Sequence, residues 1–115
     1  MKFKYENEFA FRKEESQRVL RKYPDRVPII CEQYSKSKNI AKIDKNKYLV
    51  PRDITVAQFI YIIRSRLKLP AEQALYLIIE GTIPSSIELV SSVYEIYKDK
   101  DGFLYVEYTN ENTFG

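Results

Sequence analysis

The sequence of 115 residues contains no histidine and a single cysteine, Cys31. Without histidine the chain cannot build a histidine/cysteine zinc site, a serine-histidine-aspartate triad or a cysteine-histidine dyad, so most hydrolytic chemistry is excluded. One cysteine also excludes an internal disulfide bond and fits a reducing compartment. Because Cys31 follows the apolar residues 27–30, we interpret it as a buried thiol that packs as a small hydrophobic group.

Long apolar segments are missing as well. The sequence has no run of eighteen apolar residues and no signal peptide, so any membrane association would need a partner or a covalently attached lipid. It has only three glycines and neither a repeat nor a low-complexity tract, while 44% of its residues are hydrophobic and 30% are charged. These values are typical of a globular protein, and the length predicts one domain with its own core.

The net charge of +3 is distributed unevenly along the chain. Residues 1–52 contain 14 lysines and arginines against 7 acidic residues, whereas residues 53–115 contain 5 against 9. The first part therefore carries +7 and the second −4. A basic region of this kind attracts nucleic acid, anionic lipid headgroups or an acidic protein segment, and the sign of the charge does not choose among them.

Hydrophobic periodicity predicts eight helices and strands in an α+β order. The helix at 55–68 has the clearest pattern, because apolar residues recur at three- and four-residue spacing and Thr55 with Gln58 forms a capping box. The continuous apolar run at 75–79 predicts a strand buried on both faces. This order indicates a sheet with helices mostly on one face. The predicted helices cover residues 4–8, 11–23, 55–68 and 89–97, and the predicted strands cover 27–32, 47–51, 75–79 and 103–108.

The strand predicted at 47–51 is the segment most relevant to function. Side chains alternate along a strand, so Lys47 and Leu49 point to one face while Tyr48 and Val50 point to the other. Pro51 has no N–H group, which favours a sheet edge or a strand end. An edge strand can pair with a segment of another chain, which is recognition by β-augmentation. On pattern alone, a covered edge strand explains the same residues.

Two other motifs imitate known sites and fail on inspection. Residues 99–102 look like part of a calcium-binding loop, but Tyr97 and Tyr108 then occupy positions that require acidic residues. Residues 102–108 resemble the aromatic strand of RNA-recognition domains. There, however, Asp101 stands where a basic residue is expected and Leu104 where a small residue is expected. No metal site is predicted.

Four segments together resemble a known family. They read KYPDRVP at 22–28, KNKYLVP at 45–51, KDKDGFLYV at 98–106 and ENTFG at 111–115. With them the sequence is similar, from Met1 to Gly115, to the ubiquitin-like autophagy modifiers, the light-chain-3 and GABA-A-receptor-associated-protein group. The resemblance implies a single domain with a ubiquitin-like β-grasp fold. Residues 1–23 would form an N-terminal helical extension, 24–108 the core and 109–115 a flexible conjugation tail.

The resemblance also implies a function. Such a protein is a modifier and adaptor, not an enzyme, and needs no cofactor. Its terminal glycine, Gly115 here, would be joined to phosphatidylethanolamine on autophagosomal membranes, so that the protein occurs in the cytoplasm and on those membranes. The implied partners are activating and conjugating enzymes, a cysteine protease that processes or delipidates the protein, and peptide motifs of autophagy receptors.

By the same resemblance, the strand at 47–51 would bind motifs with an aromatic residue followed three places later by an aliphatic one. The alternation of its side chains supports two pockets independently. Acidic residues that precede the motif would meet basic side chains. The aromatic pocket is predicted from Val19, Pro28, Ile30, Lys47, Leu49 and Phe103; the aliphatic pocket from Tyr48, Val50, Pro51, Ile54, Phe59, Ile62 and Ile63; and the acidic-flank contacts from Arg26, Lys45, Lys47 and Arg66.

Two alternative functions stay open at this point. The first is a basic nucleic-acid-binding module that uses Phe103, Tyr105 and the basic first half, although no nucleic-acid partner is expected from the resemblance. The second is an adaptor that keeps the peptide groove but is never conjugated to lipid. The terminal position of Gly115 favours conjugation, because a carboxylate without a neighbouring side chain fits a narrow catalytic channel.

Overall fold

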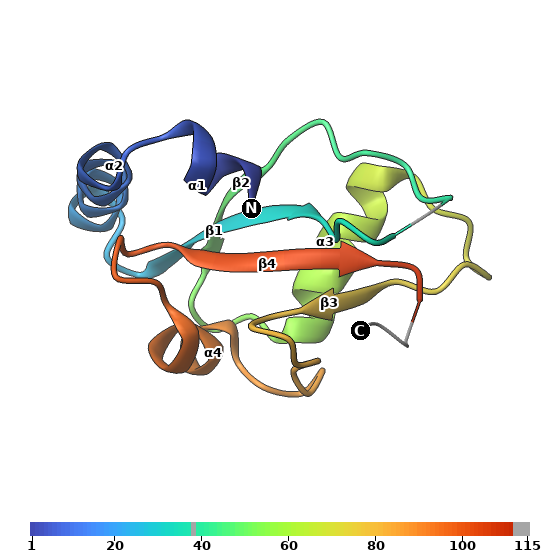
Figure 1. Cartoon of the computed structure of the whole chain (residues 1–115). Coiled ribbons are helices and arrows are strands. Elements are labelled where there is room, and N and C mark those ends of the chain that lie inside the picture. Colours follow the sequence, from blue (N-terminus) through green and yellow to red (C-terminus); the bar gives the residue numbers. More distant parts are fainter. Residues whose placement is uncertain (38, 112–115) are drawn as a thin grey trace.

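The computed structural model describes residues 1–37 and 39–111. It begins with helices α1 (Lys2–Glu6) and α2 (Phe9–Lys22), followed by strands β1 (Arg26–Gln33) and β2 (Lys47–Pro51). Helix α3 (Val56–Leu67), strand β3 (Tyr76–Ile78), helix α4 (Val90–Tyr97) and strand β4 (Leu104–Thr109) complete the order, which is the predicted one (Figure 1).

The strands form one sheet in the order β2-β1-β4-β3. Strands β1 and β4 lie side by side in the centre and are parallel, while β2 and β3 pair antiparallel on the outside (Figure 1). The expected edge position of β2 is confirmed. Strand β3 forms the opposite edge, and the predicted burial of its apolar run is confirmed at Leu77 and Ile78, but the strand is only three residues long. A tight turn shortens it, because Ile79 pairs with Thr82 and both Glu80 and Gly81 have positive φ.

Apolar side chains cover both faces of the sheet. On one face Val27, Ile29 and Cys31 of β1 share a large cluster with residues of α3 and α4, such as Ile63 and Val93. Cys31 is completely buried in this cluster, which confirms the prediction of a buried thiol that packs as a small hydrophobic group, and burial raises the pKa of the thiol. On the opposite face a smaller cluster forms around Phe3, Ile30 and Phe103. Helices therefore lie on both faces, because α1 brings Phe3 to the second one.

The ends of the helices follow local hydrogen bonds. The predicted capping box is present: the Gln58 N–H donates to the Thr55 hydroxyl at 3.2 Å, and the Gln58 side chain accepts from the Thr55 N–H at 2.8 Å. Both N-terminal helices begin two residues earlier than predicted, because the extended Asn7 separates them and the Arg12 N–H bonds to the Glu8 carbonyl. No helix within the described residues is long and apolar enough to cross a membrane.

Candidate functional site

Strand β2 lies at the sheet edge, where part of its main chain has no partner strand among the described residues. Its pairing with β1 is flanked by two hydrogen bonds, Cys31 N–H to Asn46 carbonyl at 2.8 Å and Arg52 N–H to Asp25 carbonyl at 3.1 Å. Antiparallel ladders alternate, so the main-chain groups of Tyr48 and Val50 face β1. Those of Lys47 and Leu49 therefore face outward, and no other strand in the described part of the chain pairs with them.

The guanidinium of Arg26 touches this outward edge. Its Nη1 atom lies 3.5 Å from the Leu49 carbonyl oxygen, as expected for an acceptor that no strand uses. Pro51, which has no N–H, ends the row of donors at its exposed end. An incoming strand could thus exchange hydrogen bonds with Lys47 and Leu49 but not with the N atom of Pro51.

The side chains of β2 alternate as predicted. Tyr48 and Val50 are buried in the large cluster, where the Tyr48 ring meets Phe59 edge-on at 5.8 Å between ring centres. Lys47 is exposed and Leu49 half-buried on the opposite face, where the Lys47 ammonium lies 5.2 Å from the centre of the Phe3 ring. Burial raises the pKa of Tyr48 to about 12, so its hydroxyl stays protonated at physiological pH.

The residues predicted for the aromatic pocket share the face that α1 and α2 cover. Register places Pro28 opposite Leu49 and Ile30 opposite Lys47, and side chains opposite each other point to the same face. Phe103 packs with Ile30 in the smaller cluster. Val19 is half-buried on α2, which packs against β1. The structure brings these residues to one face, and their role as a pocket stays a prediction.

The residues predicted for the aliphatic pocket divide between core and surface. Phe59 and Ile63 are almost completely buried in the large cluster, together with Tyr48 and Val50. Ile54 is half-buried against that cluster, and Pro51 and Ile62 are exposed. A ligand on this side would meet Pro51, Ile54 and Ile62 first. The use of this side as a pocket stays a prediction as well.

The other predicted cations also have neighbours. Arg66 donates two hydrogen bonds to the Asp44 carboxylate, at 2.7 and 3.3 Å. The bond from Arg66 lowers the pKa of Asp44, and the same bond raises the pKa of Arg66. The Lys45 ammonium lies 5.1 Å from the centre of the Tyr48 ring. Acidic residues of a bound peptide would therefore compete with Asp44 for Arg66.

Lys47 bridges the two N-terminal helices. Its Nζ atom lies 3.7 Å from the Glu15 carboxylate of α2, in addition to its position over the Phe3 ring of α1. Sequence reasoning missed Phe3, Glu15 and Asp44 as neighbours of the site. Phe3 and Glu15 are far from β2 along the chain, and no periodic pattern marks any of the three; only the position of Phe3 between two lysines hints at a buried side chain.

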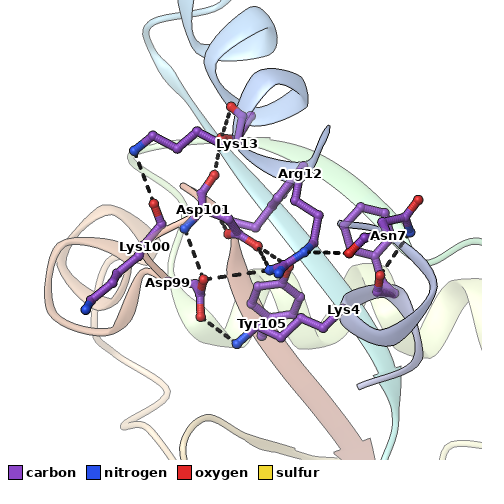
Figure 2. A network of polar contacts seen from close by, with 11 residues as sticks. Lys4, Asn7, Arg12, Lys13, Asp99, Lys100, Asp101 and Tyr105 are labelled. Carbon is purple, nitrogen blue, oxygen red and sulfur yellow. Dashed lines mark hydrogen bonds and ion pairs between the residues drawn. The ribbon is translucent and has the colours of Figure 1, made fainter. Parts of the chain in front are cut away.

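The turn at residues 99–102 is a structural anchor for the N-terminal helices. Asp101 is fully buried and accepts hydrogen bonds from Arg12 at 2.6 Å, from the Phe103 N–H at 2.9 Å and from the Tyr105 hydroxyl. Asp99 accepts a bond from Lys4 at 2.5 Å. Figure 2 shows these side chains converging from α1, α2, the turn and β4. The acidic motif that imitates a calcium loop thus binds cations of its own chain.

Glycine is required at one position in this turn. Gly102 has a φ of +94°, and a Cβ atom there would come within 2.9 Å of the Ser16 Cβ. The Gly102 carbonyl accepts a hydrogen bond from the Tyr94 hydroxyl at 2.7 Å. The turn therefore fits closely between α2 and α4. No group of three or more potential metal-ligating side chains occurs in residues 1–37 and 39–111.

The predicted conjugation residue Gly115 lies outside the described residues. Strand β4 ends at Thr109, whose hydroxyl accepts a hydrogen bond of 2.6 Å from Ser37. The end of β4 is thus bonded to the loop that follows β1. Conjugation through Gly115 stays a prediction.

Comparisons with known proteins agree with this architecture. The sequence model of the family described as autophagy protein Atg8, ubiquitin-like, matches residues 11–115. Autophagy-related protein 8 of Kluyveromyces lactis is 54% identical over 117 residues, covering 100% of this chain and 94% of that protein. Autophagy-related protein 8 of Neosartorya fischeri is 54% identical over 114 residues, covering 99% of this chain and 96% of that protein.

A solved structure shows the same fold. The crystal structure of Trypanosoma brucei ATG8 superimposes with a TM-score of 0.92 at 42% sequence identity, and the match covers 100% of this chain and 98% of that one. The fold is therefore ubiquitin-like, in the α+β class, with the two predicted helices before the core. The family match, the identity to the fungal proteins and the shared fold lead to one conclusion: the chain belongs to the Atg8 ubiquitin-like family of autophagy proteins.

Proposed function

We propose that this protein is a modifier whose Gly115 carboxylate becomes attached to the amine of phosphatidylethanolamine on autophagosomal membranes. Membership of the family supports the proposal, as does the glycine at position 115. An activating enzyme would adenylate the carboxylate with ATP, releasing pyrophosphate, and a cysteine thiol would displace AMP to give a thioester. The lipid amine would then attack the thioester, forming an amide and releasing the thiol.

This attachment would account for a membrane role of a chain whose described residues include no helix able to span a membrane. The lipid brings two acyl chains, which anchor a protein stably where a single chain gives only marginal binding. The protein would then occur both in the cytoplasm and on autophagosomal membranes. A cysteine protease would release it again by hydrolysis of the amide. The protein itself would catalyse no step.

Reconstitution tests the conjugation directly. The protein is incubated with family activating and conjugating enzymes, ATP and phosphatidylethanolamine liposomes, and its intact mass and flotation are measured. We expect the wild type to gain the mass of one lipid and float, and Gly115→Ala to be strongly impaired, while Thr113→Ala serves as a matched tail control. If the wild type stays unmodified beside a family member that is lipidated, the unconjugated adaptor is the better description.

We further propose that β2 binds receptor peptides by strand addition. The observation that carries this proposal is the pair of outward-facing residues, Lys47 and Leu49, whose main-chain groups have no partner strand among the described residues. The two faces beside this edge would receive the aromatic and the aliphatic residue of the motif. Arg26, Lys45 and Arg66 would meet acidic residues that precede it, which adds on-rate and selectivity more than affinity.

A proline substitution separates main-chain docking from side-chain packing. Leu49→Pro removes an N–H of β2 that points away from β1, so the pairing of β2 with β1 should stay intact. A carbonyl of the incoming strand would then have no donor at this position. We expect the affinity for a peptide with the motif Trp-x-x-Leu to fall at least tenfold, about 1.4 kcal/mol. Leu49→Ala is the matched control for the lost side chain. Equal affinity of the proline and alanine variants, both folded, would exclude strand addition.

The nucleic-acid alternative has less support. Phe103 is covered by Phe3 of α1, and Tyr105 is half-buried, with the Lys4 ammonium 4.7 Å from the centre of its ring. Base stacking needs open ring faces. Titration with single-stranded RNA at two salt concentrations tests this alternative, since phosphate binding depends steeply on salt.

A further inference from the structure

Helix α1 contributes an aromatic ring to the face that carries the predicted aromatic pocket. Phe3 is the one residue of α1 whose side chain is buried. Its ring meets Phe103 edge-on, with 5.5 Å between ring centres and 76° between ring planes, and it also packs against Ile30. Edge-on aromatic pairs are stabilising beyond the area they bury. Phe3 therefore restricts the position of Phe103, which the sequence assigns to the pocket.

The same ring also contacts a second residue of the site. The Lys47 ammonium lies 5.2 Å from the centre of the Phe3 ring, within the range of a cation–π interaction. On its other side this ammonium is 3.7 Å from the Glu15 carboxylate. Lysine side chains are flexible, so two simultaneous neighbours select one orientation of the Lys47 stem. Phe3 thus contacts Lys47 of β2 and Phe103, which directly precedes β4, at the same time.

The position of Phe3 is fixed by polar contacts at both sides of the helix. The Glu32 carboxylate accepts the N–H groups of Lys2 at 2.7 Å and of Phe3 at 2.9 Å. The Lys4 ammonium bonds to Asp99 at 2.5 Å. A helix of five residues is not stable alone, so these contacts and the burial of Phe3 keep α1 in place. Tyr5, in contrast, is 89% exposed and offers a control on the same helix.

We propose that Phe3 is a positioning residue of the peptide site, which holds Phe103 and Lys47 in the arrangement that receives the aromatic side chain of a docked motif. The inference rests on the proposed peptide binding at β2 and adds helix α1 to that site. Helix α1 would then contribute to the preference of the site for an aromatic over an aliphatic residue at the first anchor position of the motif.

A double-mutant cycle tests this role. Binding of two synthetic peptides, identical except for Trp or Leu at the first anchor position, is measured by calorimetry for the wild type, Phe3→Ala, Phe3→Leu and Tyr5→Ala. We expect Phe3→Ala to weaken binding of the Trp peptide about fivefold and of the Leu peptide less than about twofold, since Phe103, once released by Phe3, would lose a well-placed ring contact only with the Trp side chain. Phe3→Leu keeps an apolar side chain at this position but removes the ring beneath Lys47. Its affinity for the Trp peptide should lie between those of the wild type and Phe3→Ala.

The controls keep the outcomes distinct. Tyr5→Ala should bind both peptides like the wild type. Glu32→Gln weakens the bonds to the Lys2 and Phe3 N–H groups but leaves the Phe3 side chain unchanged, so it should reduce Trp binding in the same pattern but less. It also serves if Phe3→Ala fails to fold. Equal loss for both peptides, or tighter binding by Phe3→Ala, would overturn the positioning role. Failure of the folded wild type to bind either peptide would instead overturn the proposed peptide binding itself.

Discussion

The two faces of the sheet are held by different kinds of interaction. On the face of α3 and α4, buried aliphatic and aromatic side chains form one large cluster. On the face of α1 and α2, the apolar cluster is small, and the helices are tied to the core through charged groups around Asp99 and Asp101 (Figure 2). Apolar packing does not depend on the ionisation of side chains and is not screened by salt, whereas ion pairs depend on both. The N-terminal extension should therefore respond to conditions that leave the ubiquitin-like core unchanged.

The largest effect is expected on the apolar face. Ile63 is completely buried, so Ile63→Ala removes apolar contacts and leaves a cavity that costs about 4 kcal/mol of unfolding free energy. Ile62→Ala, on the exposed side of the same helix, is the matched control and should cost less than about 1 kcal/mol. Urea denaturation measures both. Similar losses for the two variants would contradict the assignment of the core.

The polar face should be weakened by Asp101→Asn. The amide keeps the volume and accepts some hydrogen bonds, but Arg12 loses the nearer of its two carboxylate partners, at 2.6 Å, and keeps Asp99 at 4.0 Å. We expect a loss of about 2 kcal/mol, below the cost of a fully unpaired buried charge. Hydrogen exchange should accelerate in α1 and α2 before it does in α3. Asp53→Asn, at an exposed position, is the control, and uniform acceleration across the chain would contradict the comparison.

Acid should release α1 before the core unfolds. Burial alone would raise the pKa of Asp99, but the hydrogen bonds from Lys4 and from the Asp101 N–H outweigh burial and lower it. A lowered pKa in the folded state means that the stabilisation is present above the unfolded pKa of about 3.9 and is lost as the pH falls below it. Because Lys4 and Asp99 keep contact with water, the effect is at most about 1 kcal/mol. In a nuclear magnetic resonance titration, the signals of α1 should shift as the pH falls below about 4 in the wild type, and this shift should be absent in Asp99→Asn.

The smallest effect has the opposite sign. Burial raises the pKa of Glu107, and the neighbouring Glu32 raises it further, while the N-terminal ammonium lowers it. The folded protein thus disfavours the ionised carboxylate, and stability falls as the pH rises from the unfolded pKa through the folded pKa. Glu107→Gln should raise the unfolding free energy at pH 7 by less than about 1 kcal/mol and have no effect below about pH 4. Glu88→Gln, at an exposed position, is the control; a Glu107→Gln variant that is less stable than the wild type at pH 7 would contradict this sign.

Local chemistry made part of this structure predictable from the sequence. The capping box at Thr55 and Gln58 and the alternation along β2 depend on residues within a few positions of each other, and both are present. The bond between Arg12 and Asp101 joins residues 89 positions apart, and no spacing rule indicates such a pair. For the same reason the motif at 99–102 could be rejected as a calcium loop but not recognised as an anchor.

The candidate site shows the same limit. Residues of β1 and β2 that share a face follow from register and alternation, whereas Phe3, Glu15 and Asp44 became neighbours of the site only through tertiary packing. The length of β3 was also overestimated, because an apolar run shows burial but not where a turn ends the pairing. Sequence patterns thus predict elements and faces better than the contacts between distant segments.

The parallel pairing of β1 with β4 has a consequence for synthesis of the protein. Strand β1 is complete after residue 33, but its central partner begins only at Leu104. During translation β1 can pair with β2, yet its other edge stays unpaired until almost all of the described chain has been made. Exposed edges of apolar strands favour aggregation and engage chaperones, and pairing between distant segments is slow. A nascent chain stalled before residue 104 should therefore be bound by chaperones. Its N-terminal helices should also stay undocked, because the turn at residues 99–102 that anchors them is not yet held in place by β4.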